Sequence, residues 1–355
     1  MILPTQPGAH LAAVRSAMPE NRVDREQTVE ALARLFPREP REWIASLVER
    51  SGVETRHIVP SIDEVLGRSS FTARNQRYRE AAARLAATAC LEALQAAGVE
   101  PAAVDVVIDV SCTGIAIPAL DVDLAPRLGL RSDVRRIPIT ESGCAAGGLA
   151  LGLAASLAQG GQRVLVIAVE LCSLTLCRGD LTRTNLVASV LFGDGAAAAV
   201  VVPGGEGPRL EAVGSHLIPG TSGVMGFDVG DHGLKIVLQR ELPVVLEKEL
   251  PRAVERFLHA HGRALDDLAL HLVHPGGRRI LEAYTQVFGL DGEALRFSRE
   301  SLRRYGNLSS ASILTVLELA LADGVRLPPD KEALLVAVGP GLSLELALMR
   351  WEPGR

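Results

Sequence analysis

The sequence is poor in aromatic residues and in long apolar runs. Aromatic side chains make up 3% of the 355 residues, so Ala, Val and Leu must build the core from an apolar fraction of 48%. No apolar run approaches the ~18 residues that a membrane-spanning helix needs, so we expect no membrane insertion. The stretch from Met1 to Met18 has neither a basic start nor an apolar segment, and a signal peptide is therefore not expected.

An excess of one charge is also missing. The net charge is −5, and acidic and basic residues are interspersed, which argues against nucleic acid or an anionic membrane as the main partner. The five cysteines are odd in number, and none forms a C-x-x-C pair or stands near a His with zinc-ligand spacing. We therefore expect neither a disulfide framework nor a metal site, and we expect a reducing cytoplasm as the location.

The pattern that is present is that of an α/β protein. Short apolar runs rich in Val, Leu and Ala alternate with helical segments, and such runs fit strands of a sheet that helices cover on both faces. A Pro- and Gly-rich stretch at 203–208 is the best candidate for a junction, so we divide the chain into halves at 1–205 and 206–355. The expected buried strands are 104–110, 163–170, 196–202, 268–273, 333–338 and 343–350.

The order of elements in the first half returns in the second. Cys112 precedes Cys144 by 32 residues, and His274 precedes Asn307 by 33. Cys144 and Asn307 each follow a Gly and begin a helix of small residues, expected at 145–159 and 309–321. A duplicated layout with a pseudo-twofold axis brings these two helix starts together, with His274 at the carboxyl end of a strand facing the same crevice.

Cys144 by itself would be an ordinary buried cysteine, although the start of a helix favours its thiolate. Together, Cys144, His274 and Asn307 supply a nucleophile, a base-like partner and a neutral hydrogen-bond donor. A papain-like hydrolase uses such a set with water as the final acceptor. A carbon–carbon condensing enzyme uses it to hold one acyl group as a thioester and to stabilise the enolate of a second. The order of elements favours the condensing enzyme.

From about Pro19 to Trp351 the chain resembles the type III polyketide synthases, the chalcone synthase-like enzymes of the thiolase superfamily, and their bacterial members in particular. The resemblance implies a thiolase-like α/β fold in which two duplicated αβαβα halves form a five-layered sandwich. It also implies a cytoplasmic homodimer that acts on CoA thioesters, malonyl-CoA and an acyl-CoA starter, without a cofactor. The motifs that carry it are 143–148, 190–198, 274–277, 306–312 and 339–341.

The resemblance assigns a role to each matching position. Cys144 looks like the acyl-accepting nucleophile, His274 and Asn307 look like the pair that stabilises the enolate after decarboxylation, and Phe192 matches the gatekeeper aromatic. Arg50 and Arg56 are candidates for binding the CoA phosphates. The positions that match the lining of the substrate cavity are Cys112, Thr113, Ile117, Cys172, Thr175, Ile236, Ser309, Gly339, Pro340 and Gly341.

One difference from the plant members of the family bears on the choice of starter. Plant members carry a second gatekeeper Phe where this chain has Ile236. An aliphatic cavity favours a fatty-acyl starter and an alkylpyrone or alkylresorcinol product, because each buried CH₂ contributes ~0.8 kcal/mol. The alternative is a malonyl-primed synthase of the tetrahydroxynaphthalene type. A ketoacyl synthase III-like enzyme ranks below both. The histidine motif of those enzymes resembles His-Gln-Ala-Asn, whereas residues 274–277 of this chain are His-Pro-Gly-Gly. A thiolase-fold protein that only binds acyl-CoA would not need to keep all three reactive residues.

Overall fold

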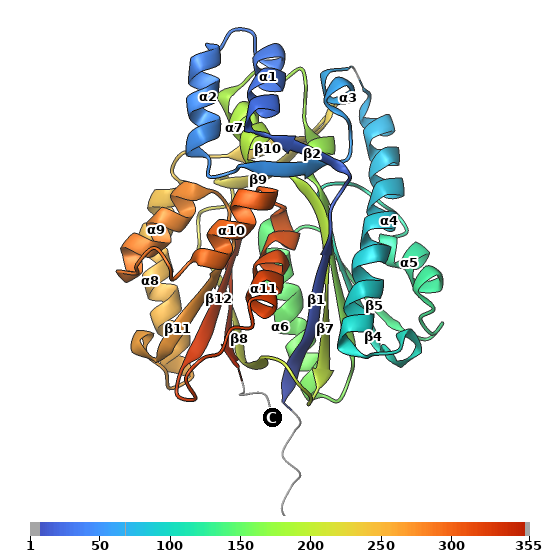
Figure 1. Cartoon of the computed structure of the whole chain (residues 1–355), viewed down its shortest axis with the longest axis vertical. Coiled ribbons are helices and arrows are strands. Elements are labelled where there is room, and N and C mark those ends of the chain that lie inside the picture. Colours follow the sequence, from blue (N-terminus) through green and yellow to red (C-terminus); the bar gives the residue numbers. More distant parts are fainter. Residues whose placement is uncertain (1–7, 68, 352–355) are drawn as a thin grey trace, which may run out of the picture.

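The computed structural model describes residues 8–67 and 69–351. The expected halves 1–205 and 206–355 therefore lie within the described part except for residues 1–7 and 68 of the first half and residues 352–355 of the second. The helices and strands lie in layers (Figure 1). The strands are β1 (Ala9–Ala17), β2 (Asn21–Asp24), β3 (Thr55–Ile58), β4 (Val106–Val110), β5 (Arg135–Ile139), β6 (Val164–Leu171), β7 (Asp194–Pro203), β8 (Arg209–Leu217), β9 (Met225–Gly230), β10 (Gly233–Leu238), β11 (Leu268–Val273), β12 (Glu332–Gly339) and β13 (Ser343–Arg350).

The helices fall between these strands. They are α1 (Arg25–Leu35), α2 (Arg41–Arg50), α3 (Ile62–Leu66), α4 (Phe71–Ala97), α5 (Leu120–Leu128), α6 (Ala146–Gln159), α7 (Arg183–Leu191), α8 (Leu242–Ala260), α9 (Arg278–Phe288), α10 (Arg296–Tyr305) and α11 (Ser312–Ala322). No helix of the described part of the chain is long and apolar enough to cross a membrane.

The strand order repeats between the two halves of the chain. The first half runs β1-β7-β6-β4-β5 and the second β8-β13-β12-β11, and in both the first two pairings are antiparallel and the third is parallel. The halves join through β1 and β8 by the pairs Ala9–Leu210 and His10–Arg209. This repeated order confirms the thiolase-like α/β fold that the sequence resemblance implies.

Five layers result, as Figure 1 shows. Helices α4 and α5 cover the outside of one half of the sheet, and α8 and α9 cover the outside of the other. Helices α6 and α11 lie between the two halves, and α6 contacts strands of both. The close fit depends on small residues, because a Cβ on Gly147 would lie 2.2 Å from the carbonyl oxygen of Ser310 and one on Gly148 2.8 Å from Cβ of Ala337.

The expected central helices begin later than the sequence pattern indicates. Cys144 lies in a short 3-10 turn, Gly143–Ala145, directly before α6, and Ser309 lies in the equivalent turn, Ser309–Ala311, before α11. Ser309 has φ 48°, the one positive φ of a non-glycine residue in the described part of the chain. An α-helix cannot contain this conformation, so α11 starts only at Ser312.

A separate layer above the sheets closes the cavity described below. It contains the two-stranded sheets β2–β3 and β9–β10 together with α1, α2, α3 and α7 (Figure 1). The sequence pattern does not predict the hairpin β9–β10. Its residues are mostly exposed or half-buried and show no clean alternation.

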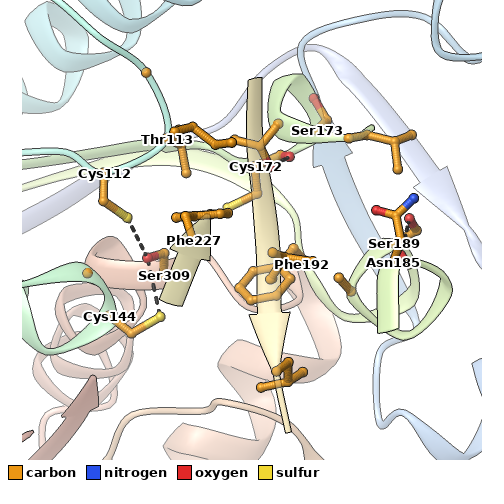
Figure 2. A pocket seen from close by; sticks show the side chains of 18 of the residues that line it. Cys112, Thr113, Cys144, Cys172, Ser173, Asn185, Ser189, Phe192, Phe227 and Ser309 are labelled. Carbon is orange, nitrogen blue, oxygen red and sulfur yellow. Dashed lines mark hydrogen bonds between the residues drawn. The ribbon is translucent and has the colours of Figure 1, made fainter. Parts of the chain in front are cut away.

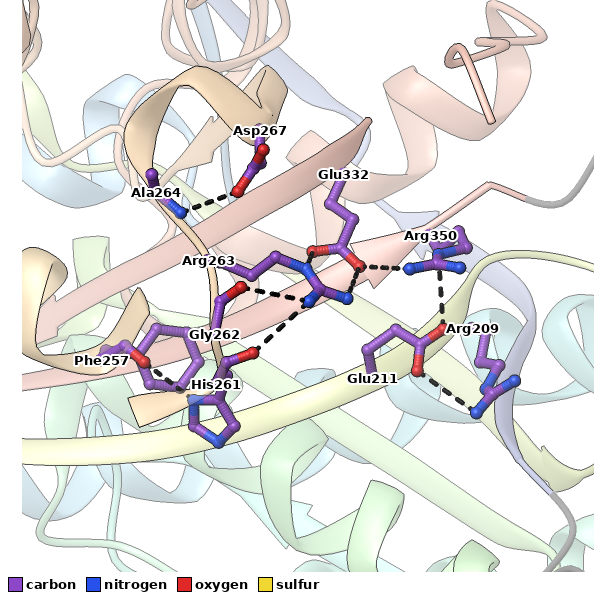
Figure 3. Close-up of polar contacts among 10 residues, drawn as sticks. All are labelled: Arg209, Glu211, Phe257, His261, Gly262, Arg263, Ala264, Asp267, Glu332 and Arg350. Carbon is purple, nitrogen blue, oxygen red and sulfur yellow. Dashed lines mark hydrogen bonds and ion pairs between the residues drawn. The ribbon is translucent and has the colours of Figure 1, made fainter. Parts of the chain in front are cut away.

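The opposite end of the sheet is held by an ion-pair cluster (Figure 3). Glu332 at the start of β12 is 1% exposed, and its carboxylate accepts hydrogen bonds from Arg263 at 2.8 Å and from Arg350 at 2.8 Å. Burial alone would raise the pKa of Glu332, but the two guanidinium groups outweigh it and the net pKa is lowered. The cluster therefore ties the α8–β11 connection to β12 and β13.

Candidate active site

Cys144 lies at the start of α6 with its thiol directed at Ser309. The Cys144 side chain is 8% exposed, and its Sγ is 3.3 Å from Oγ of Ser309 (Figure 2). The preceding Gly143 has φ 52°, and a Cβ there would lie 2.7 Å from Cδ of Pro340. The turn that carries the thiol is thus packed directly against the 339–341 loop, which requires glycine at 143.

Asn307 is fixed by its backbone and by its side-chain oxygen. Its N–H donates to the carbonyl of Leu191 at 2.8 Å, and its Oδ1 accepts the N–H of Ser309 at 2.8 Å and the Ser312 hydroxyl at 3.3 Å. Because Oδ1 is occupied as an acceptor, Nδ2 is the donor end of the amide. It donates to the carbonyl of Gly276 at 3.3 Å.

His274 directly follows the last residue of β11. Its N–H donates to the carbonyl of Val336 at 2.8 Å, its side chain is 2% exposed, and a Cβ on Gly276 would lie 3.6 Å from its Nε2. Hydrogen-bond contacts therefore link Cys144 to Ser309, Ser309 to Asn307, and Asn307 to the carbonyl of Gly276, which lies two residues after His274. The structure thus places the three residues that the sequence singled out in one region of the fold.

Burial keeps the reactive pair uncharged. Removal from water raises the pKa of the Cys144 thiol to about 12, against the Ser309 hydrogen bond, which lowers it. Burial likewise lowers the pKa of His274 to about 4. Burial therefore acts against the thiolate that the helix start favours. In the resting site it favours a thiol and a neutral imidazole.

A cavity of about 720 Å³ extends from the Cys144 thiol (Figure 2). His274, Asn307, Gly339 and Gly341 do not contribute to its wall within the described residues, and neither does Arg50. The expected lining residues that do contribute are Cys112, Thr113, Ile117, Cys172, Thr175, Phe192, Ile236, Ser309 and Pro340.

Glu170 is a residue of the site that sequence reasoning missed. It is fully buried at the end of β6, and its carboxylate accepts the N–H of Cys112 at 3.1 Å, the hydroxyl of Thr113 at 2.7 Å and the hydroxyl of Ser310. Burial raises its pKa, and these donors act against that rise. The signal was present in the sequence, since Glu170 is the one acidic residue in the apolar run 163–170.

The outer part of the cavity was also missed. Its wall is formed by aliphatic side chains of the upper layer and by the hairpin β9–β10, which adds one aromatic ring, Phe227 (Figure 2). No local pattern identifies such residues, because they come from segments far apart in the sequence. The aliphatic members from α1 and α3 are Ala31, Leu32, Leu35, Ile62 and Val65.

The two arginines expected at the CoA phosphates lie in different surroundings. Arg50 is exposed on α2, where its Nε donates to the carbonyl of Ser46 at 3.1 Å. Arg56 is 7% exposed, and its guanidinium donates to the carbonyl of Val190 at 2.6 Å and to Oγ1 of Thr28 at 3.1 Å. Protein acceptors therefore already hold the guanidinium of Arg56, which also lines the cavity. Binding of the CoA phosphates by Arg50 or Arg56 stays a prediction.

No group of three or more His, Cys, Asp or Glu side chains is placed to hold a metal ion within residues 8–67 and 69–351. The five cysteines are all free thiols.

The fold consists of two thiolase-like halves, and its site contains a buried thiol, an imidazole and an amide. Such a thiol can accept an acyl group, and the imidazole and the amide can activate a second thioester. The protein is thus a condensing enzyme of the thiolase-fold class. Two family models narrow the class: the N-terminal domain of chalcone and stilbene synthases matches residues 4–207, and their C-terminal domain matches residues 209–352. The chain belongs to the chalcone and stilbene synthase family, and it is a type III polyketide synthase.

Similar proteins come from several bacteria. A 1,3,6,8-tetrahydroxynaphthalene synthase of Streptomyces peucetius subsp. caesius is 38% identical over 97% of this chain and 93% of its own length. A putative chalcone synthase of Bacillus subtilis is 33% identical over 98% of this chain and its whole length. The crystal structure of a 1,3,6,8-tetrahydroxynaphthalene synthase from Streptomyces coelicolor superimposes with a TM-score of 0.93 at 36% identity, covering 97% of this chain and all of that one.

Proposed function

We propose that the enzyme repeatedly condenses malonyl-CoA, with loss of CO₂, onto an acyl group held as a thioester on Cys144. The proposal is supported chiefly by the hydrogen-bond contacts that link the thiol of Cys144 to Asn307, with His274 in the same region of the fold. No cofactor enters this scheme, because breaking the carbon–carbon bond to CO₂ supplies the electron pair for the new bond.

The loading step transfers the acyl group from CoA to Cys144. The sulfur of Cys144 attacks the thioester carbon, the bond to the CoA sulfur breaks, and the thiol proton passes through His274 to the leaving CoA thiolate. A thiol with a pKa of about 12 gives up its proton only as the new bond forms, so a nearby neutral imidazole that can accept it is needed.

The extension step needs donors that do not protonate a carbanion. When malonyl-CoA loses CO₂, the electron pair forms an enolate, whose oxygen accepts hydrogen bonds from His274 and from Nδ2 of Asn307. Its carbon then attacks the Cys144 thioester, and the cysteine sulfur leaves as thiolate. A histidine with a pKa of about 4 is neutral at pH 7, so its N–H donates a hydrogen bond to the enolate without the acidic proton that an imidazolium would transfer to it.

The starter is proposed to be a fatty acyl-CoA, with cyclisation to an alkylpyrone or alkylresorcinol. The aliphatic wall between α1 and α3 and the aliphatic Ile236 support this, because each CH₂ removed from water there contributes ~0.8 kcal/mol. The cavity of about 720 Å³ provides room for a chain in addition to the extended polyketide.

A second candidate is priming by malonyl-CoA itself, with a naphthalene-type product. Its support comes from the named relatives, 1,3,6,8-tetrahydroxynaphthalene synthases that are 38% identical to this chain. Phe227 in the cavity also makes the wall less purely aliphatic than the sequence suggests.

Product analysis by mass spectrometry separates the candidates. The purified enzyme is incubated with malonyl-CoA alone and with malonyl-CoA plus hexanoyl- or lauroyl-CoA. Alkylpyrone or alkylresorcinol masses that appear only with the acyl-CoA support the fatty-acyl starter. A malonyl-only product with no turnover of either acyl-CoA contradicts it and supports the second candidate. The absence of any product across a wide starter panel contradicts both.

We also propose that the enzyme acts as a homodimer. The loop between β4 and α5 exposes two apolar side chains, Ile115 by 45% and Ile117 by 89%. Exposed apolar side chains of this kind favour burial against a second copy. Light scattering on the purified protein tests this, and an Ile117→Asp variant is expected to weaken the dimer. A monomeric wild type contradicts the proposal.

A further inference from the structure

The turn at residues 191–194, between α7 and β7, connects two functional residues. It carries Phe192, whose ring lines the cavity (Figure 2). Its backbone also pairs with Asn307: the carbonyl of Leu191 accepts the Asn307 N–H at 2.8 Å, and the N–H of Gly193 donates to the Asn307 carbonyl at 3.0 Å. We call residues 191–194 the gate turn. Any shift of the gate turn moves both Phe192 and Asn307.

Arg56 of β3 holds the gate turn from the other side. Its Nη1 donates to the carbonyl of Val190 at 2.6 Å and, at 3.4 Å, to the carbonyl of Phe192. A Cβ on Gly193 would lie 2.3 Å from the carbonyl oxygen of Tyr305 and 3.3 Å from Cβ of Arg56. The gate turn is therefore enclosed between Arg56 and the segment that leads into Asn307, without room for a side chain at Gly193.

The remaining contacts of Arg56 fix its own position. Its Nη2 donates to Oγ1 of Thr28, and Thr28 in turn donates to the carbonyl of Asp24 at the start of α1. Asp194, the last residue of the gate turn, is fully buried and accepts the N–H groups of Val59 and Ser173 at 2.7 Å each. Its negative charge supports the nearby guanidinium.

A buried arginine is costly unless its charge is compensated. Burial lowers the pKa of Arg56 to about 10, with Asp194 acting against that change, so Arg56 remains a cation at neutral pH. Two of its hydrogen bonds go to backbone carbonyls on either side of Leu191. Charge-assisted bonds of this kind are the stronger class of hydrogen bond, and their direction fixes the backbone that accepts them.

We propose that Arg56 is a positioning residue for the condensation: it fixes the gate turn, so that Phe192 and the amide of Asn307 keep their places relative to Cys144. This rests on the condensing activity proposed above. Arg56 touches the carbonyl of Val190, directly before the gate turn, and that of Phe192 within it, so its removal should affect the extension step more than the loading of Cys144.

The test compares an Arg56→Gln variant with wild type on two kinds of malonyl thioester. One is malonyl-CoA, and the other is malonyl-N-acetylcysteamine, which has no phosphate. Arg56→Gln is expected to lower kcat by about ten- to a hundredfold with both, as a displacement of roughly 1 Å does in other enzymes. Cys144 should still acquire its acyl adduct, visible by mass spectrometry. Arg56→Lys should recover part of kcat, since an ammonium can still donate to the carbonyls of Val190 and Phe192.

Two further variants keep the test informative. Thr28→Val removes one acceptor of Arg56 and should shift kcat in the same direction by a smaller factor, even if Arg56→Gln folds poorly. Arg22→Gln is the matched control, because exposed Arg22 lies on β2 next to Val23, which pairs with Arg56. It should leave kcat within about twofold of wild type, as surface changes usually do.

A loss confined to malonyl-CoA would show that Arg56 serves the CoA phosphates and would overturn the proposal. Unchanged kcat in Arg56→Gln, or a lower melting temperature with kcat per folded enzyme unchanged, would overturn it as well. If wild type itself forms no condensation product with any starter, the proposed function has failed rather than the role of Arg56.

Discussion

Substitution of Gly147 by alanine tests how closely the two halves must approach beneath the reactive thiol. Gly147 lies in the first turn of α6, three residues after Cys144. An added Cβ would lie 2.2 Å from the carbonyl oxygen of Ser310, a distance that real Cβ atoms essentially never show. The carbonyl of Ser310 belongs to the backbone of the turn that follows Asn307 and cannot rotate away as a side chain could. The two helix starts must therefore move apart by roughly 1 Å, because a packed interior has no space for the added methyl group.

The expected cost follows from two opposing effects. Overpacking of a core costs about 1–3 kcal/mol, and the higher helix propensity of alanine returns about 1 kcal/mol, so the net destabilisation is about 0–2 kcal/mol. The effect on kcat should be larger than the effect on stability. A displacement of roughly 1 Å between Cys144 and Asn307 is expected to lower kcat by about a hundredfold.

Gly152→Ala is the matched control on the same helix. A Cβ there would lie 3.5 Å from Cβ of Val213, an ordinary contact, so alanine should stabilise the protein by about 0.5–1 kcal/mol and leave kcat unchanged. Denaturant midpoints and kcat are measured for both variants. Equal stabilisation by the two substitutions, or full activity of Gly147→Ala, would refute the argument that contact across the halves sets the geometry of the site.

Further predictions concern the reactive residues and a buried carboxyl group. Cys144→Ala should lose the acyl adduct in mass spectrometry, and retained loading would rule out Cys144 as the nucleophile. His274→Gln should load Cys144 more slowly, because it lacks the imidazole that accepts the thiol proton, and the loaded enzyme should condense about 10²–10³-fold more slowly in single-turnover assays, as loss of one oxyanion donor does elsewhere. An undiminished condensation rate would contradict its role. Burial and the neighbouring Asp121 raise the pKa of Asp109 to about 7 from an ordinary 3.8, so the native state retains this proton between about pH 4 and 7 and loses stability as pH rises through that window. Asp109→Asn should therefore gain about 1–3 kcal/mol relative to wild type between pH 5 and pH 8 in denaturant titrations, and a difference that does not change with pH would contradict this.

Several elements of the fold follow directly from local patterns. The expected strands at 268–273 and 343–350 match β11 and β13 residue for residue, because their apolar runs are bounded by residues that end a strand. The helix expected at 145–159 starts one residue later as α6. The boundaries of the hairpin β9–β10 were not predictable, since its residues alternate weakly and are held by contacts with α7 and with the 3-10 turn Cys172–Thr175.

The site shows the same division. Cys144, His274 and Asn307 could be selected from motifs and from the equal spacing of two halves. The hydrogen-bond partners of Glu170 and Arg56 could not be predicted, because the sequence gives the charge of these residues but not what their side chains contact. Arg56 carries the charge of a phosphate ligand, yet the fold places it against the carbonyls of Val190 and Phe192.

The sequence by itself determined the alternation of strands and helices, the duplication, and the identity of the reactive groups, because these depend on residue types at fixed spacings along one chain. Only the tertiary structure decided what those groups experience. Burial raises the pKa of the Cys144 thiol and lowers the pKa of His274, and segments distant in sequence assemble the cavity and enclose the gate turn. Desolvation and close approach arise from the packing of the whole chain, and no local pattern records them.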